Sequence, residues 1–348
     1  MNEVKRVDDR HSPLSGGCGL HPREDEKHKS IFPLHKGKTR GRTGITKKVQ
    51  AGRKTRVAKL CQNCERGGDM PATYTPLRYP GGKTKLYDEI KPLLHSVGDS
   101  AVYVEPFAGG AGLALKLLFY GDAESIVLND IDENIYSFWM SCLNQTDELC
   151  QMIKTSELSI EEWDRQREVL EHPDQHSCLE RAFALFYMNR CNRSGIIKGG
   201  PIGGRNQNGN YKLDVRFNKQ GLIKKIKDIG NRRNSISVYC MDGKRFLTEI
   251  CQNLPRNALI NIDPPYVSKG PELYQNSFSK QDHIDLSKTI KGLSHKWVVT
   301  YDVNELIRDL YNDFPMRDIV LGYSAGSQRK TGHEYLITNI AQGAEKDV

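Results

Sequence analysis

Residues 258–266, ALINIDPPY, join a short apolar run to an acidic residue, two prolines and a tyrosine. An apolar run of this length before chain-breaking residues predicts a buried strand. Proline lacks a backbone donor and fixes φ, so sheet pairing must end directly after Asp263. Because ligands of α/β proteins bind at the carboxyl ends of strands, Asp263 and Tyr266 are expected at the lip of a crevice on a rigid support. An ordinary strand exit with a capping Asp would show the same residues.

Six further segments have the residue pattern of strands. Helical patterns lie between several of them, as in residues 111–121 and 132–143. This alternation predicts an α/β fold with a mostly parallel sheet of seven strands and helices on both faces. The long gap between the second and third strands predicts an inserted lobe. The predicted strands are residues 101–107, 125–130, 235–242, 258–266, 296–302, 317–323 and 334–340.

The first predicted strand ends in a glycine-rich turn, EPFAGGAG at residues 105–112. Such a turn lets the backbone approach a ligand closely, and the following helix N-terminus favours the ligand's polar groups. The second strand ends at Asp130, about twenty residues further on, where a carboxylate can accept hydrogen bonds from both ribose hydroxyls. Together the two features predict a pocket for an adenosine-containing cofactor. A glycine turn needed for packing, with a helix-capping Asp, would explain them as well.

Basic residues are concentrated in two parts of the chain. Residues 1–69 carry 17 Lys and Arg against 8 Asp and Glu, and residues 178–246 carry 15 against 4. The first part has almost no periodic apolar pattern and is predicted to be a disordered basic tail. The second part interleaves Tyr187, Tyr211 and Phe217 with the basic residues, which favours a nucleic-acid surface. A solvated face of the protein would have a similar composition.

The 348-residue chain has no apolar run long enough to span a membrane and no hydrophobic region typical of a signal peptide near residue 1. We therefore expect a cytoplasmic protein with no membrane partner. Nine scattered cysteines indicate free thiols. Cys61 and Cys64 have zinc-knuckle spacing, but no second pair follows, so no metal is expected. The pattern of a folded domain begins at Met70, which could also be the true translation start.

Five segments, in this order, resemble the Dam-type (D12 class, alpha-arrangement) amino-methyltransferases. That family methylates adenine N6 in DNA with S-adenosylmethionine. The resemblance covers roughly Pro76 to Ile340 and implies a Rossmann-like class I methyltransferase sheet with an inserted, mainly helical DNA-recognition lobe. One departure is Ala111, which stands where the family's Phe-x-Gly-x-Gly has its last glycine. The segments are RYPGGKTKL (78–86), YVEPFAGGAG (103–112), VLND (127–130), FYMNRCNRSGI (186–196) and NIDPPY (261–266).

The resemblance implies a catalytic role for the four residues Asp263, Pro264, Pro265 and Tyr266. Asp263 and the Pro264 carbonyl would accept the two N–H groups of the adenine amino group, and the prolines would hold these acceptors rigidly. The target base must leave the duplex, and Tyr266 could stack on it. Transfer from a sulfonium needs alignment and no metal. The implied cofactor-binding residues are Tyr79, Lys83 (to the methionine carboxylate), Phe107, Gly109, Asp130 and, more weakly, Asp242, which a capping role would explain equally well.

The predicted organisation places catalysis in residues 70–150 and 235–348, and DNA recognition in residues 151–234. Double-stranded DNA is the expected partner, and the protein is expected to be a monomer or weak dimer in a prokaryotic cytoplasm, associated with the nucleoid. Arginine suits guanine and asparagine suits adenine, although any such residue could instead contact phosphate. The resemblance is too distant to imply GATC as the target. The candidate DNA-binding residues are Arg190, Asn192, Arg193, Arg205, Asn208 and Tyr211.

Three other functions are compatible with these motifs. Cytosine-N4 methylation uses the same architecture, but its motif more often begins with serine than with the aspartate found at position 263. A non-catalytic DNA-binding protein would not need the acceptor geometry of Asp263–Tyr266. The third function is methylation of a protein amide, for which related enzymes carry asparagine at the first position of the same motif. The aspartate therefore favours adenine.

Overall fold

The structure, a computed structural model, describes residues 73–78, 82–267, 278–325 and 328–341. These residues belong to one compact unit, Thr73–Val348. The predicted tail with its three cysteines, and Tyr79, lie outside the described residues. The six cysteines that the structure describes are all free.

A seven-stranded sheet forms the centre of this unit, with strand order β3-β2-β1-β4-β5-β7-β6. The first five strands are parallel, and β7 runs antiparallel to both β5 and β6. This is a Rossmann-like class I methyltransferase sheet, and all seven predicted strands are confirmed. Their bounds are β1 Val102–Glu105, β2 Ser125–Asn129, β3 Ile236–Tyr239, β4 Ala258–Ile262, β5 Lys296–Asp302, β6 Met316–Ala325 and β7 Gln328–Thr338.

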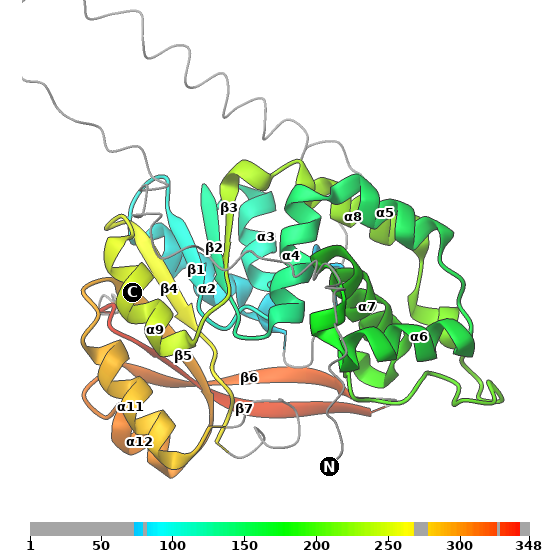
Figure 1. Cartoon of the computed structure of the whole chain (residues 1–348). Helices are drawn as coiled ribbons and strands as arrows, with labels where there is room; N and C mark the ends of the chain where they lie inside the picture. Colours follow the sequence, from blue (N-terminus) through cyan, green and yellow to red (C-terminus); the bar gives the residue numbers. More distant parts are fainter. Residues whose placement is uncertain (1–72, 79–81, 268–277, 326–327, 342–348) are drawn as a thin grey trace, which may run out of the picture. The chain divides into compact units, whose positions relative to one another are not determined.

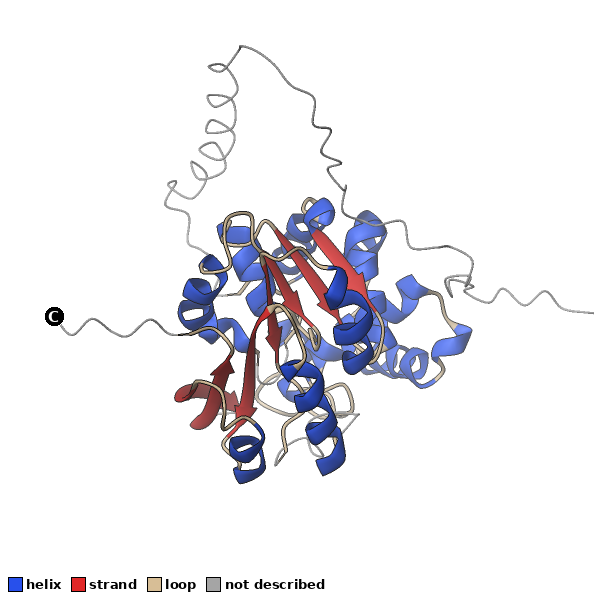
Figure 2. Cartoon of the chain, turned by 90° about the vertical axis from the view of Figure 1, so that its left-hand side faces the viewer, coloured by secondary structure: helices blue, strands red, loops and turns tan. Residues whose placement is uncertain are grey.

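Helices cover both faces of the sheet (Figures 1 and 2). The two helices expected at residues 111–121 and 132–143 are present as α3 and α4. Several helices begin at side-chain caps, such as Asp132 before α4 and the Ser177–Glu180 capping box of α7. The helices are α2 Tyr87–His95, α3 Gly112–Tyr120, α4 Glu133–Asn144, α5 Thr146–Thr155, α6 Ile160–Glu171, α7 Cys178–Cys191, α8 Lys219–Gly230, α9 Gly243–Arg245, α11 Lys280–Lys291 and α12 Glu305–Leu310.

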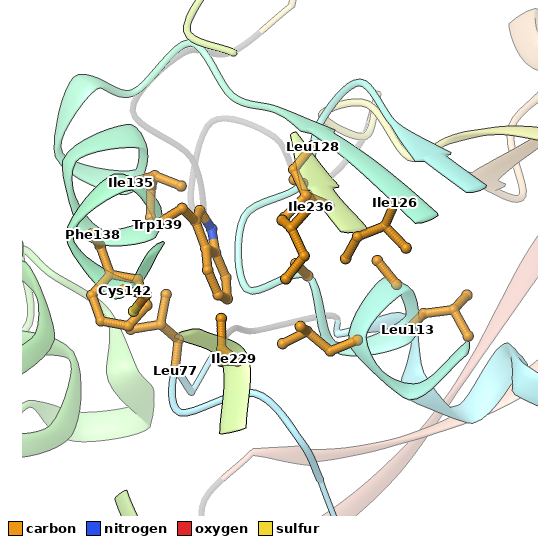
Figure 3. Packing of buried hydrophobic residues seen from close by; sticks show 14 of the residues in the cluster. Leu77, Leu113, Ile126, Leu128, Ile135, Phe138, Trp139, Cys142, Ile229 and Ile236 are labelled. Carbon is orange, nitrogen blue, oxygen red and sulfur yellow. The ribbon is translucent and has the colours of Figure 1, made fainter. Parts of the chain in front are cut away.

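The buried side chains form two hydrophobic clusters, and successive residues of a strand enter different ones. In β4, Leu259 belongs to the first cluster, whereas Ile260 and Ile262 belong to the second. This alternation follows from the two-residue period of a strand. Figure 3 shows part of the first cluster, where Trp139 of α4 lies near Ile236 of β3. The central strands are thus fixed on both faces, which holds their carboxyl ends in place.

The inserted segment is mainly helical and shares the first cluster. Helices α5 to α8 gather beside the β3 end of the sheet (Figure 1). Phe186 of α7 stacks on Phe138 of α4, with ring centroids 6.0 Å apart. The lobe therefore packs on the sheet domain through a common core.

None of the helices that the structure describes is long and apolar enough to cross a membrane.

Candidate active site at the carboxyl ends of the strands

Asp263 follows β4 directly, at the edge of the sheet where the parallel strands end. Its Oδ1 accepts a hydrogen bond from Thr300 Oγ1 on β5 at 2.9 Å and lies 3.2 Å from Lys83 Nζ. The side chain is 21% exposed. In the described part of the chain Oδ2 makes no hydrogen bond. One carboxylate oxygen is thus held from two sides, while the other is available to a ligand.

Lys83 begins the 3₁₀ turn Lys83–Leu86 and is buried. Its ammonium lies between Asp263 and Glu334 of β7, 3.3 Å from Glu334 Oε2, and donates to Tyr266 Oη. Lys83 thus contacts the predicted catalytic residues Asp263 and Tyr266, and the sequence motifs give no signal of this contact.

Tyr266 is only 8% exposed, because its ring packs near Tyr301 with centroids 6.3 Å apart. The ammonium of Lys83 lies 4.8 Å from the ring centroid. Val267, the next residue, donates its N–H to Asp302 Oδ1 at 3.2 Å. The segment after β4 is therefore anchored to β5. In this conformation little of the tyrosine ring is open for the stacking that the sequence predicts.

The glycine turn and Asp130 meet as the spacing predicts. Asp130 Oδ2 accepts from Gly109 N at 2.8 Å, and Oδ1 accepts from Asp132 N at 3.0 Å. Burial raises the pKa of Asp130 to about 6, although the hydrogen bonds from the backbone oppose this shift. Ala111 adopts a left-handed conformation with φ 45°, which explains why glycine suits this position. The turn and the carboxylate form one rigid unit.

Two buried residues at the same edge were missed by the sequence interpretation. Asn129, the last residue of β2, donates to the carbonyls of Pro106 and Met241, each at 2.9 Å, and so ties the ends of three strands together. Glu105, the last residue of β1, accepts from Tyr103 Oη at 3.1 Å. Burial, reinforced by the charge of Asp263, raises the pKa of Glu105 to about 8. The sequence did hold a signal for both residues, since each is a polar residue at the end of an apolar strand.

The other two predicted cofactor residues lie at this edge as well. Phe107 is partly buried, and a Cβ at Gly243 would come within 2.4 Å of its ring. Asp242 caps α9, since its Oδ1 accepts from the N–H groups of Lys244 and Arg245, each at 3.0 Å. The capping role considered for Asp242 is thus present.

Of the predicted DNA-binding residues, Asn192 is buried and Arg190 is half-buried. Asn192 is fully buried; its Oδ1 accepts from Trp163 Nε1 at 2.7 Å, and its Nδ2 donates to the carbonyls of Ile196 and Ile197. Arg190 donates to the carbonyls of Arg216 and Pro76, and burial, with Arg78 and Arg216 nearby, lowers its pKa to about 10. Both side chains thus hold loops of the protein in this structure.

The remaining candidates lie on the surface. Arg193, Arg205, Asn208 and Tyr211 are all exposed. Arg193 and Tyr211 line a cavity of about 350 Å³ together with the glycines between them. Arg205 makes two hydrogen bonds to Asp164 of α6, at 2.8 and 2.7 Å. The glycine-rich loop thus presents two of the expected residues beside one cavity.

Comparisons with known proteins agree with this geometry. A family model of D12 class N6 adenine-specific DNA methyltransferases matches residues 79–321. The type II methyltransferase M.MjaIII of Methanocaldococcus jannaschii is 23% identical over 291 residues, which cover 76% of this chain and 98% of that protein. The type II methyltransferase M.CviBI of Paramecium bursaria Chlorella virus NC1A is 22% identical over 245 residues, covering 68% and 86%.

Solved structures of methyltransferases are also similar to this chain. An S-adenosylmethionine-dependent methyltransferase from Agrobacterium tumefaciens has a TM-score of 0.36 and 10% identity, and covers 78% of this chain and 71% of its own. The fold assignment rests on the strand order, not on this likeness. The family model spans more than half of the chain, including the glycine turn and Asp263–Tyr266. The chain therefore belongs to the D12 class of N6 adenine-specific DNA methyltransferases, with S-adenosylmethionine as its methyl donor.

Proposed function

We propose that Asp263 is the hydrogen-bond acceptor that prepares the adenine amino group for methylation. The observation that carries this proposal is the fixed carboxylate at the end of β4, with Oδ1 held by Thr300 and Lys83 and Oδ2 open. The lone pair of the amino nitrogen is delocalised into the ring, so N6 is a poor nucleophile. An acceptor on its N–H groups favours a more tetrahedral nitrogen with a localised lone pair.

The Pro264 carbonyl is the proposed second acceptor. Asp263 and Pro264 are adjacent, and Pro264 and Pro265 fix the backbone between the strand and Tyr266. S-adenosylmethionine supplies a methyl group already activated by its sulfonium, so the protein's part is alignment of the nitrogen with the carbon–sulfur bond. The bond from N6 to the methyl carbon forms as the carbon–sulfur bond breaks, and the positively charged nitrogen then releases one proton to water.

The proposed cofactor pocket lies along the ends of β1, β2 and β3. Its donor set suits the parts of S-adenosylmethionine: Asp130 can accept from ribose hydroxyls, the backbone at Gly109 can approach closely, and Phe107 offers an apolar wall. The buried carboxyl group of Glu105, whose pKa burial raises to about 8, can accept a hydrogen bond from the ammonium of the methionine portion. The contact of Lys83 with Asp263 supports a role for this lysine beside the acceptor, and the two hydrogen bonds that Asp242 accepts support a capping role for that residue.

DNA recognition is proposed for the lobe of residues 151–234, with catalysis in residues 70–150 and 235–348. The exposed Arg193 and Tyr211 beside their cavity, with Arg205 and Asn208 in the same loop, support contacts to double-stranded DNA. The target adenine would have to be flipped out of the duplex to reach Asp263. Cytosine-N4 methylation has no observation in its favour.

Expression in a host free of DNA methylation, followed by sequencing of modified bases, tests this function. We expect N6-methyladenine in one sequence context. N4-methylcytosine, or unmodified DNA from cells that contain the folded protein, would contradict the proposal.

A further inference from the structure

Glu334 is a buried carboxylate that contacts Lys83, the same lysine that contacts the proposed acceptor Asp263. It is on β7, in register with Asp302 of β5, and is 2% exposed. Its Oε2 lies 3.3 Å from Nζ of Lys83, the same ammonium that lies 3.2 Å from Asp263 Oδ1. Burial, with the charge of Asp263, raises the pKa of Glu334, although Lys83 and Tyr266 oppose this shift. A charged group in this position is costly unless it is paired.

The charges of Lys83, Asp263 and Glu334 explain why Lys83 needs a second carboxylate partner. With Lys83 protonated and both carboxylates ionised, the cluster has a net charge of −1. Without Glu334, Lys83 and Asp263 would form a neutral pair, and the ammonium would draw electron density from the acceptor. A positive charge also develops on the adenine nitrogen as it takes the methyl group. A net negative cluster stabilises that charge, and a neutral one does so less.

We infer that Glu334 is a positioning residue for methyl transfer, which balances the charge of Lys83 so that Asp263 stays an effective acceptor with its open oxygen toward the substrate. Glu334 acts through Lys83, which touches Asp263 Oδ1 and Tyr266 Oη. This inference rests on the proposed role of Asp263. It assigns a function to the antiparallel strand β7, which carries the carboxylate into the site from a distant part of the sequence.

The test compares Glu334→Gln with wild type in methylation of unmethylated plasmid DNA by S-adenosylmethionine, from pH 6 to 9. Glutamine keeps the size of the side chain and one acceptor oxygen, but it removes the charge and replaces the second oxygen by a donor NH2 group. We expect kcat to fall roughly ten- to a hundredfold, which is the usual loss when a residue that supports a functional group from behind is removed. The KM for S-adenosylmethionine and the KM for DNA should each stay within about twofold of wild type. Glu305→Gln, at an exposed carboxylate, should leave kcat unchanged.

Three further readouts separate charge balance from a structural role. Because Lys83 loses a counter-charge in Glu334→Gln, its pKa should fall and the alkaline limb of kcat should move to lower pH. The double variant Lys83→Met/Glu334→Gln should lose no more activity than Lys83→Met alone, since Glu334 acts through the lysine. Glu334→Asp, which keeps the charge, should recover most of kcat and the wild-type pH profile.

Wild-type kcat in Glu334→Gln would overturn the inference. So would a lower kcat with an unshifted pH profile and additive losses in the double variant, because that result describes a packing defect. If Glu334→Gln does not fold, the decision rests on Glu334→Asp and on the double variant. The inference fails if Glu334→Asp, which keeps the charge, is as inactive as Lys83→Met, or if the double variant loses more activity than Lys83→Met. The proposed role of Asp263 fails separately, through an active Asp263→Ala enzyme.

Discussion

At the scale of single residues, the site depends on polar groups that hold one another. Asp263 is oriented by Thr300 from the next strand and by Lys83 from a segment about 180 positions earlier in the chain. Asp263 and Tyr266 could be predicted, because two prolines after an apolar run mark a strand end. Thr300 and Glu334 could not, since a threonine or glutamate inside a strand has no local signal of what lies on the neighbouring strand.

Thr300→Val should lower kcat by about tenfold, because loss of one hydrogen bond to a charged group costs about 1.5 kcal/mol. Valine has nearly the same shape, so binding of S-adenosylmethionine, measured by calorimetry, should stay the same. Thr300→Ser restores the hydroxyl and should restore activity. Equal kcat in Thr300→Val and wild type would show that the carboxylate needs no such support.

Glu105 predicts a specific dependence of stability on pH. Its pKa in the folded state, about 8, is above the ordinary value of 4.5, so between these values the folded chain holds a proton that the unfolded chain has lost. The free energy of unfolding should therefore fall as pH rises through this window, by up to about 1.4 kcal/mol per pH unit from this group.

The measurement is urea unfolding of wild type and Glu105→Gln, without cofactor, at pH 5.5, 7 and 8.5. Glutamine cannot ionise, so the difference in stability should shift in favour of the variant as pH rises. Parallel stability profiles for the two proteins would contradict the assignment.

At the scale of elements, the segment 73–78 joins the catalytic site to the recognition lobe. Asn189 of α7 accepts from Arg78 N and donates to Arg78 O, each at 2.7 Å. Gly195 has φ +78°, and a Cβ there would come within 2.4 Å of Arg78 O. Arg190, Asn192 and Arg193 of the sequence FYMNRCNRSGI are predicted to contact DNA, because arginine suits guanine and asparagine suits adenine. Composition does not separate an amide turned inward, as in Asn192, from one turned to solvent.

Gly195→Ala should destabilise the protein by at least about 1 kcal/mol more than Gly204→Ala. Both glycines have positive φ, but a Cβ at Gly204 meets nothing within 4 Å, so the difference isolates the contact with Arg78. Thermal or urea unfolding measures it. Equal losses in the two variants would show that the loop at Gly195 moves without cost.

At the scale of the whole molecule, we propose that the sheet carries the chemistry and the lobe binds the DNA. The strands, the glycine turn and the position of the insertion were predictable, because each follows from residues that are close together in the sequence. The carboxylate on β7 was not, because it reaches the site only through the antiparallel insertion of β7 between β5 and β6. Charge is also unequal along the chain, with residues 178–246 carrying 15 basic and 4 acidic side chains.

Arg193 and Lys224 should differ in what they contribute to DNA binding. Arg193 lines the loop cavity, whereas Lys224 is exposed on α8 and pairs with Asp228 at 2.7 Å. Arg193→Ala should weaken binding to the cognate site by about 1 to 3 kcal/mol and relax selection at one position. Lys224→Ala should affect all sequences alike. Affinities for cognate and scrambled duplexes at several salt concentrations decide the matter; a uniform loss for Arg193→Ala would assign it to phosphate.

The most direct test of the central claim is single-turnover methyl transfer by Asp263→Ala, with binding measured in parallel. The acceptor acts on the reacting nitrogen, so the variant should bind S-adenosylmethionine and DNA as wild type does and form no detectable N6-methyladenine. Methyl transfer by Asp263→Ala within tenfold of the wild-type rate would contradict the account.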